Sequence, residues 1–220
     1  MLKGTISNLL NNVKNAIDEL VEQKAITSDI LSNYDWMSRA SIHSWLEYAL
    51  IEAGRRSNLV AVPEVKLFYD KPFDPKDIGL PSTMRRRHQK KVDVAFYSKN
   101  LRFIGFSEIT TTDEAHGCIH SKDIPNSKWV TPMDSFLYTA EHSRPKSEFV
   151  LLLTLLPKRL NRRPWNVNPE INRELRESGN DFYKVFSERW KNLANQLRKS
   201  VPNTHLILMV SENRIEFYGS

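Results

Sequence analysis

Apolar residues recur along this chain with two periods, one typical of helices and one typical of strands. From residue 2 to residue 21 they fall mostly three or four positions apart, which predicts an amphipathic helix packed on the protein's own core. The same spacing returns over residues 38–53, where Gly54 suits the position after a helix C-terminus, and over residues 181–200. A further helix is predicted over residues 132–142, with Thr131 as its N-cap.

Strand-like segments lie between and after these helices. They are residues 59–69, 92–97, 101–111, 149–156, 205–210 and 214–218. Short connections predict that the second and third segments form one antiparallel hairpin and the last two form another. The almost continuous apolar run at 149–156 suits a strand buried on both faces. Residues 70–90 contain several prolines and show no period, so they are predicted to be a long loop, as are residues 112–130 and 157–170.

Composition narrows the class of protein. The 220 residues fit one domain, and 40% apolar with 26% charged residues is ordinary globular composition. The single cysteine, Cys118, excludes an intramolecular disulfide framework, an all-cysteine zinc site and an iron–sulfur cluster held within the chain. No run of 18 apolar residues occurs, and residues 1–7 lack the apolar region of a signal peptide. We therefore expect a cytoplasmic location and no membrane partner.

Positive charge exceeds negative charge by six, with 32 Lys and Arg against 26 Asp and Glu. This modest excess favours a polyanionic partner without deciding the question. Nine of the cations fall in two predicted loops: Arg85, Arg86, Arg87, Lys90, Lys91, Lys158, Arg159, Arg162 and Arg163. We expect these side chains to contact nucleic-acid phosphates, the alternative being that they belong to solvated loops.

Two carboxylates stand beside the first basic run. Asp93 begins one strand of the predicted hairpin and Glu108 lies near the end of the other, so antiparallel pairing can bring them together. Two carboxylates held close repel one another unless a cation neutralises them. Mg²⁺ or Mn²⁺ prefers such oxygen ligands, and an ion held there can polarise a phosphodiester. The alternative is that both residues are solvated acids at strand ends.

These residues resemble the PD-(D/E)xK nuclease superfamily, which has the restriction-endonuclease-like fold. That family places an Asp at the start of the second core strand and a Glu or Asp in the third, as Asp93 and Glu108 are placed here. It often adds an acidic residue from the first helix, where Glu47 is the nearest match and Glu52 a substitute. The resemblance covers residues 38–156, whose predicted elements follow the family's αβββαβ order.

The resemblance implies an α/β fold with a central mixed sheet flanked by helices. Residues 1–36 would form an N-terminal helical extension of this single domain, 38–156 the αβββαβ core, and 157–220 a basic loop, a helix and a terminal β-hairpin. It further implies Mg²⁺ or Mn²⁺ bound by Asp93 and Glu108, with DNA as the partner. A homodimer is expected if both strands of a duplex are cut.

One position departs from the family's motif. Thr110 stands two residues after Glu108, where the family has a Lys that orients the attacking water. A Thr hydroxyl carries no charge, although it can position water. The missing cation could come from elsewhere, with Lys91, Lys66 and Lys122 as candidates. Alternatively His116 could act as the base, as a downstream His does in the short-patch mismatch-repair nucleases of this fold.

A cluster of Asp113, Glu114, His116, Cys118 and His120 fits no strong zinc spacing, so we expect no structural zinc there. The sequence therefore predicts a metal-dependent DNA endonuclease. Two alternatives stay open: a nucleic-acid-binding protein of the same fold that has lost its chemistry, and a protein-interaction module without nucleic-acid activity.

Overall fold

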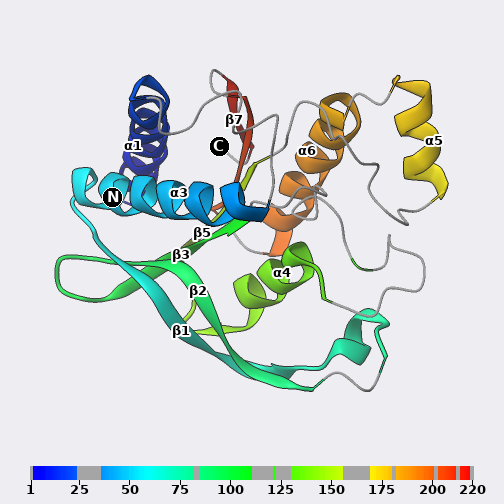
Figure 1. The fold of residues 1–220 in the computed structure, drawn as a ribbon. Coiled ribbons are helices and arrows are strands. Elements are labelled where there is room, and N and C mark those ends of the chain that lie inside the picture. Colours follow the sequence, from blue (N-terminus) through cyan, green and yellow to red (C-terminus); the bar gives the residue numbers. More distant parts are fainter. Residues whose placement is uncertain are drawn as a thin grey trace.

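The computed structural model describes residues 2–23, 36–81, 85–110, 121, 130–155, 169–179, 182–200, 203–211 and 214–218. Figure 1 shows the arrangement of its helices and strands. The helices are α1 (Leu2–Glu22), α3 (Trp36–Arg56), α4 (Pro132–His142), α5 (Pro169–Glu177) and α6 (Phe182–Ser200), with a 3₁₀ helix η1 (Pro75–Ile78). The strands are β1 (Val60–Phe73), β2 (Arg87–Tyr97), β3 (Phe103–Thr110), β4 (Ser143–Arg144), β5 (Phe149–Leu155), β6 (Thr204–Ser211) and β7 (Arg214–Tyr218).

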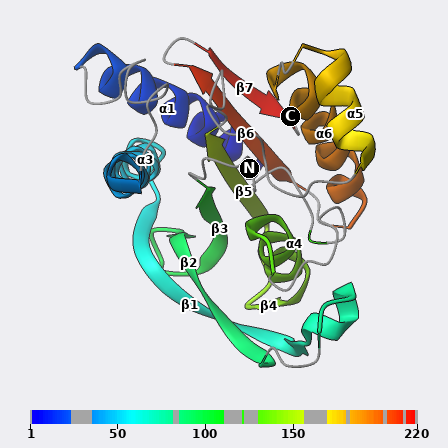
Figure 2. The same cartoon turned by 45° about the vertical axis from the view of Figure 1, so that its right-hand side comes forward.

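All these strands belong to one mixed sheet, in the order β4-β1-β2-β3-β5-β6-β7. β1, β2 and β3 pair antiparallel, whereas β3, β5 and β6 run parallel and β7 returns antiparallel beside β6. The helices flank both faces, with α1 and α3 on one side and α4, α5 and α6 on the other (Figure 2). The prediction of an α/β fold with a mixed sheet flanked by helices is therefore confirmed.

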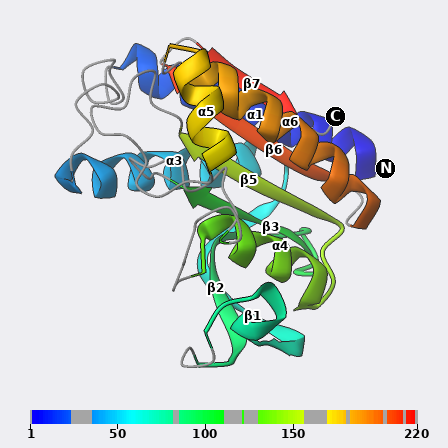
Figure 3. The same ribbon diagram turned by 90° about the vertical axis from the view of Figure 1, so that its right-hand side faces the viewer.

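Two apolar cores result, one on each face of the sheet. β5 contributes to both because its side chains alternate: Val150 and Leu152 pack toward α4 and α6, and Leu151 and Leu153 pack toward α1 and α3. This alternation explains the unbroken apolar run and confirms the prediction of a doubly buried strand. Figure 3 shows α5 and α6 lying over β6 and β7 on the second face.

Helix α1 is part of this architecture. Its buried residues share one core with α3 and with strands β2, β3 and β5. Arg56 of α3 also reaches across to Glu19 of α1, with Nη1 2.6 Å from Oε1. None of the helices in the described ranges has the length and apolar character required to cross a membrane.

The predicted long loop over residues 70–90 is wrong for most of its length. β1 continues to Phe73, η1 follows, and β2 begins at Arg87. Residues 85–91 are all polar, so β2 begins without the apolar alternation that indicates a strand, and the segment resembled a basic loop. Helix α5 and the two-residue strand β4 were also missed, and α5 begins at Pro169, within the loop predicted over residues 157–170.

Helix α4 begins where the sequence predicts it. The Thr131 hydroxyl accepts a hydrogen bond from the backbone N–H of Asp134, and Asp134 in turn accepts one from the backbone N–H of Thr131. This reciprocal capping box satisfies donors that the first helical turn leaves unpaired. The predicted N-cap is thus confirmed.

Candidate active site

Asp93 lies at the point where β2 and β3 separate. Their regular pairing ends at Val94 and Ser107, which leaves Asp93 opposite Glu108 at the next position. Oδ2 of Asp93 accepts a hydrogen bond of 2.6 Å from the backbone N–H of Ile109. The carboxylate thus takes the place of a backbone acceptor on β2, and this contact holds it beside β3.

Glu108 is the most deeply buried acid of this pair, with 6% of the residue exposed. Lys90 Nζ lies 2.7 Å from its Oε1, as an ion pair rather than a well-directed hydrogen bond. Burial raises the pKa of Glu108 to about 7, opposed by the charge of Lys90 and reinforced by the neighbouring carboxylate of Asp93. The structure therefore brings the two predicted carboxylates together.

Asp93 differs from Glu108 in its electrostatics. Burial acts to raise the pKa of Asp93, but hydrogen bonds from His43 and from the backbone of Ile109 outweigh it and hold the pKa below its usual value. Asp93 is consequently ionised at neutral pH, whereas the Glu108 carboxyl is poised between its two protonation states. Environments that separate the pKa values of adjacent acids are typical of functional sites.

Helix α3 supplies a histidine that sequence analysis missed. His43 Nε2 lies 3.4 Å from Asp93 Oδ1, and its Nδ1 lies 3.8 Å from Oε2 of Glu47. The hydrogen bond to Asp93 is the main cause that raises the pKa of His43. The spacing of His43 and Glu47, one helical turn apart on the helix assigned to the first acidic residue, is the signal that could have identified this pair.

Glu47 lies at the edge of the site, in contact with His43 and near Asp93. Burial raises its pKa, the Asp93 carboxylate adds to this effect, and Lys91 and Glu64 of the neighbouring ribbon are close enough to affect it. Glu52, the predicted substitute, points elsewhere: its carboxylate binds the guanidinium groups of Arg55 and Arg56. Of the two, Glu47 is the residue that lies near Asp93.

Thr110 is buried, and its hydroxyl shares a short hydrogen bond with that of Thr154 on β5. The candidates for a displaced Lys lie in different places: Lys91 pairs with Glu64 on the exposed face of the ribbon, and Lys66 is exposed on β1. The cation that does contact a site carboxylate is Lys90, which the sequence assigned to phosphate binding. Lys122 and His116 lie outside the described residues.

The other predicted phosphate contacts divide into two groups. Arg85, Arg86 and Arg87 are exposed at the start of β2, and Arg86 forms an ion pair of 2.8 Å with Asp74. The second group, Lys158, Arg159, Arg162 and Arg163, lies outside the described residues, as does the cluster at 113–120.

Within the part of the chain that the structure describes, no group of three or more His, Cys, Asp and Glu side chains forms a metal-binding cluster. The pair formed by Asp93 and Glu108 nevertheless fits a hard divalent cation. Both ligands are oxygens, and a cation would relieve the repulsion between them, which adds to burial in raising the pKa of Glu108.

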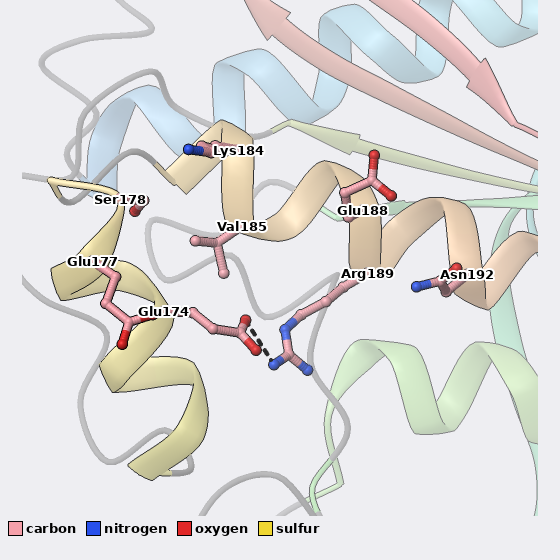
Figure 4. Close-up of a pocket in the computed structure, with 8 residues that line it drawn as sticks. All are labelled: Glu174, Glu177, Ser178, Lys184, Val185, Glu188, Arg189 and Asn192. Carbon is pink, nitrogen blue, oxygen red and sulfur yellow. Dashed lines mark hydrogen bonds and ion pairs between the residues drawn. The ribbon is translucent and has the colours of Figure 1, made fainter.

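A pocket of about 540 Å³ lies elsewhere, between α5 and α6 (Figure 4). Its charged side chains partly neutralise one another, since Arg189 Nη2 lies 3.0 Å from Glu174 Oε2. None of the candidate catalytic residues lines it.

No protein-family model matches this chain, and no curated protein or solved structure matches it either. The class of protein that the structure defines is an α/β fold with a partly buried pair of carboxylates on adjacent antiparallel strands. Any functional assignment depends on the chemistry of that pair.

Proposed function

We propose that this protein is a metal-dependent DNA endonuclease that hydrolyses phosphodiester bonds. The observation that carries the proposal is the convergence of Asp93 and Glu108 at the divergence of β2 and β3, with Lys90 beside them. Two carboxylates and a lysine are the groups needed to hold a divalent cation and to compensate charge on a phosphate.

The order of elements supports a restriction-endonuclease-like core. The series α3, β1, β2, β3, α4, β5 has the αβββαβ order of the PD-(D/E)xK superfamily, if the two-residue β4 is set aside. Asp93 lies on the second strand of that series and Glu108 on the third. In this proposal Lys90 on β2 provides the charge that the family's motif Lys provides, because Thr110 cannot.

In the proposed site, Asp93 and Glu108 hold Mg²⁺ or Mn²⁺. When bound, such an ion polarises the phosphodiester and lowers the pKa of water. The backbone N–H of Ile109 and the ring of His43 fix the orientation of Asp93. Lys90, now paired with Glu108, is placed to stabilise negative charge that develops on the phosphate. His43 is a positioning residue in this scheme.

The test is cleavage of supercoiled plasmid in the presence of Mg²⁺ or Mn²⁺. Asp93→Asn and Glu108→Gln should each abolish cleavage, because a neutral amide is a poor ligand for a hard cation, while leaving DNA binding largely intact. Asp77→Asn, an exposed acid on η1, is the matched control and should cleave like the parent. If Asp93→Asn cleaves as well as the parent, the proposal is wrong.

One observation favours a second candidate, a nucleic-acid-binding protein without turnover. Both carboxylates already have a partner, the Lys90 ammonium for Glu108 and the His43 ring for Asp93, so the folded state does not require a metal. This candidate predicts salt-sensitive DNA binding with no metal-dependent cleavage. A protein-interaction module would show neither DNA binding nor cleavage, so the plasmid assay together with a binding assay separates the three candidate functions.

If the protein converts the plasmid to its linear form rather than its nicked form, sedimentation should show the predicted homodimer.

A further inference from the structure

The ribbon formed by β1 and β2 has two unlike faces beyond the end of α3 (Figure 1). One face is buried: Leu67 and Val92 belong to the core under α4, and the Tyr69 hydroxyl bonds the hydroxyl of Thr139. None of the helices in the described ranges covers the other face. On it Lys66 and Phe68 of β1 lie directly across from Lys91 and Gln89 of β2.

Phe68 is a large apolar residue on this open face, and 60% of it is exposed to solvent. It lies in the middle of a strand, so its ring stands on a sheet surface and not at the tip of a turn. Lys66 lies two residues before it on β1, and Lys91, the cross-strand partner of Lys66, lies on the same face. Lys91 forms an ion pair with Glu64, whereas Lys66 forms none with any described residue. The surroundings of the ring are therefore positively charged.

The open face leads to the proposed active site. Alternation along β2 directs Gln89 and Lys91 to this open face, at an interval of about 6.6 Å, and Asp93 follows two residues after Lys91. That interval is comparable with the spacing of successive phosphates along a nucleic-acid strand. The charge of Lys91 acts to lower the pKa of Glu47 on α3, so this face lies near the His43–Glu47 pair.

We propose that this face binds an unpaired segment of the nucleic-acid substrate, with a base stacked on Phe68 and the backbone running past Lys66 and Lys91 toward Asp93. The inference rests on the proposed function and names its substrate class as DNA with a single-stranded region next to the cleavage position. A flat aromatic ring flanked by cations is a stacking platform, and only an unpaired base can offer its face to it. The Gln89 amide beside the ring can donate and accept hydrogen bonds from a base edge.

The experiment measures binding, without metal, to three labelled DNAs of equal length: single-stranded, fully duplex and forked. Asp93→Asn serves as the parent so that no substrate is cut. Phe68→Ala in that background should weaken binding to single-stranded and forked DNA about tenfold and change duplex binding little, because one stacking contact is lost. Phe68→Trp should retain the parent's affinity, and Phe68→Leu, which keeps apolar bulk without a ring face, should not.

Leu101→Ala is the matched control. It truncates another exposed apolar residue, 71% exposed, in the connection between β2 and β3, and should leave all three affinities unchanged. Equal losses on duplex and forked DNA would overturn the inference, since the ring would then contact paired DNA. No effect of Phe68→Ala on any DNA would also overturn it.

These outcomes are separable from the fate of the proposed function. Plasmid cleavage that depends on Asp93 but not on Phe68, with unchanged affinities, would leave the nuclease proposal standing and remove the stacking site. If the protein binds single-stranded DNA through the Phe68 ring but never cleaves DNA, the stacking site stands and the nuclease proposal is wrong.

Discussion

At the scale of single residues, the site depends on how differently two neighbouring acids are surrounded. Asp93 receives hydrogen bonds from His43 and Ile109, whereas Glu108 is buried beside a single lysine. The pKa of Asp93 is lowered and that of Glu108 is raised to about 7. The two groups therefore make opposite contributions to stability as pH changes, and Glu108 gives the clearer test.

We expect the metal-free protein to lose stability as pH rises from about 4.5 toward 7. Unfolded Glu108 ionises near its ordinary pKa of 4.5, while folded Glu108 stays protonated until about 7. This group's contribution is thus fully present below 4.5 and is lost by neutral pH, a change on the order of 3 kcal/mol. Urea unfolding at a series of pH values measures it.

Glu108→Gln should flatten that pH dependence relative to the parent, because the amide does not titrate. Mg²⁺ at neutral pH should restore stability to the parent but not to the variant. Parallel pH curves for the two proteins would contradict the assignment of the raised pKa.

Lys90 and Lys91 are adjacent in sequence and are expected to behave differently. Lys90→Ala removes the cation 2.7 Å from Glu108, so we expect kcat for cleavage to fall about a hundredfold or more with little change in DNA affinity. Lys91→Ala acts on the exposed face, where it should weaken binding and reduce its salt dependence. Cleavage kinetics with saturating DNA, beside binding titrations at several salt concentrations, distinguish the two.

At the scale of elements, helix α4 is fixed by its N-terminal cap. Asp134 Oδ2 accepts hydrogen bonds from the backbone N–H of Ser121, the backbone N–H of Thr131 and the Thr131 hydroxyl. The cap thus ties the start of α4 to a residue ten positions earlier, and α4 in turn covers the buried face of the ribbon that carries Lys90.

Thr131→Ala should destabilise the protein by about 1–2 kcal/mol, the usual cost of losing a helix N-cap. Asp134→Ala should cost more, because it leaves three donors without their acceptor. Urea denaturation measures both. Thr131→Ser, which keeps the hydroxyl, is the control and should lie close to the parent.

At the scale of the whole molecule, β3 and β5 join the antiparallel half of the sheet to the parallel half. Gly105 sits opposite Phe149 at the start of this junction. A Cβ at Gly105 would lie 2.3 Å from the Phe149 carbonyl oxygen and 2.9 Å from its ring. There is no room for any side chain at this position.

We therefore expect Gly105→Ala to destabilise the protein by about 3 kcal/mol or more through overpacking against backbone. Gly4→Ala is the opposite case: a Cβ there meets nothing within 4 Å, and alanine in α1 should stabilise by up to about 1 kcal/mol. Thermal unfolding followed by circular dichroism compares the two. A loss of stability in Gly4→Ala as large as that in Gly105→Ala would contradict this explanation.

The sequence by itself determined most of the helices and strands and the α/β class, because apolar periodicity records which face of each element is buried. It also singled out Asp93 and Glu108, since acids beside apolar strand residues are unusual. The start of β2 escaped it, because residues 87–91 are all polar and show no apolar alternation.

Only the tertiary structure decided which other groups meet those acids. His43 lies 50 residues before Asp93, and no local pattern links the two. Lys90 and Lys91 are indistinguishable in sequence, but the alternation of β2 turns the first toward Glu108 and the second toward solvent. The physical reason is that periodicity fixes a residue's face within its own element, whereas the neighbours on that face come from the packing of distant elements.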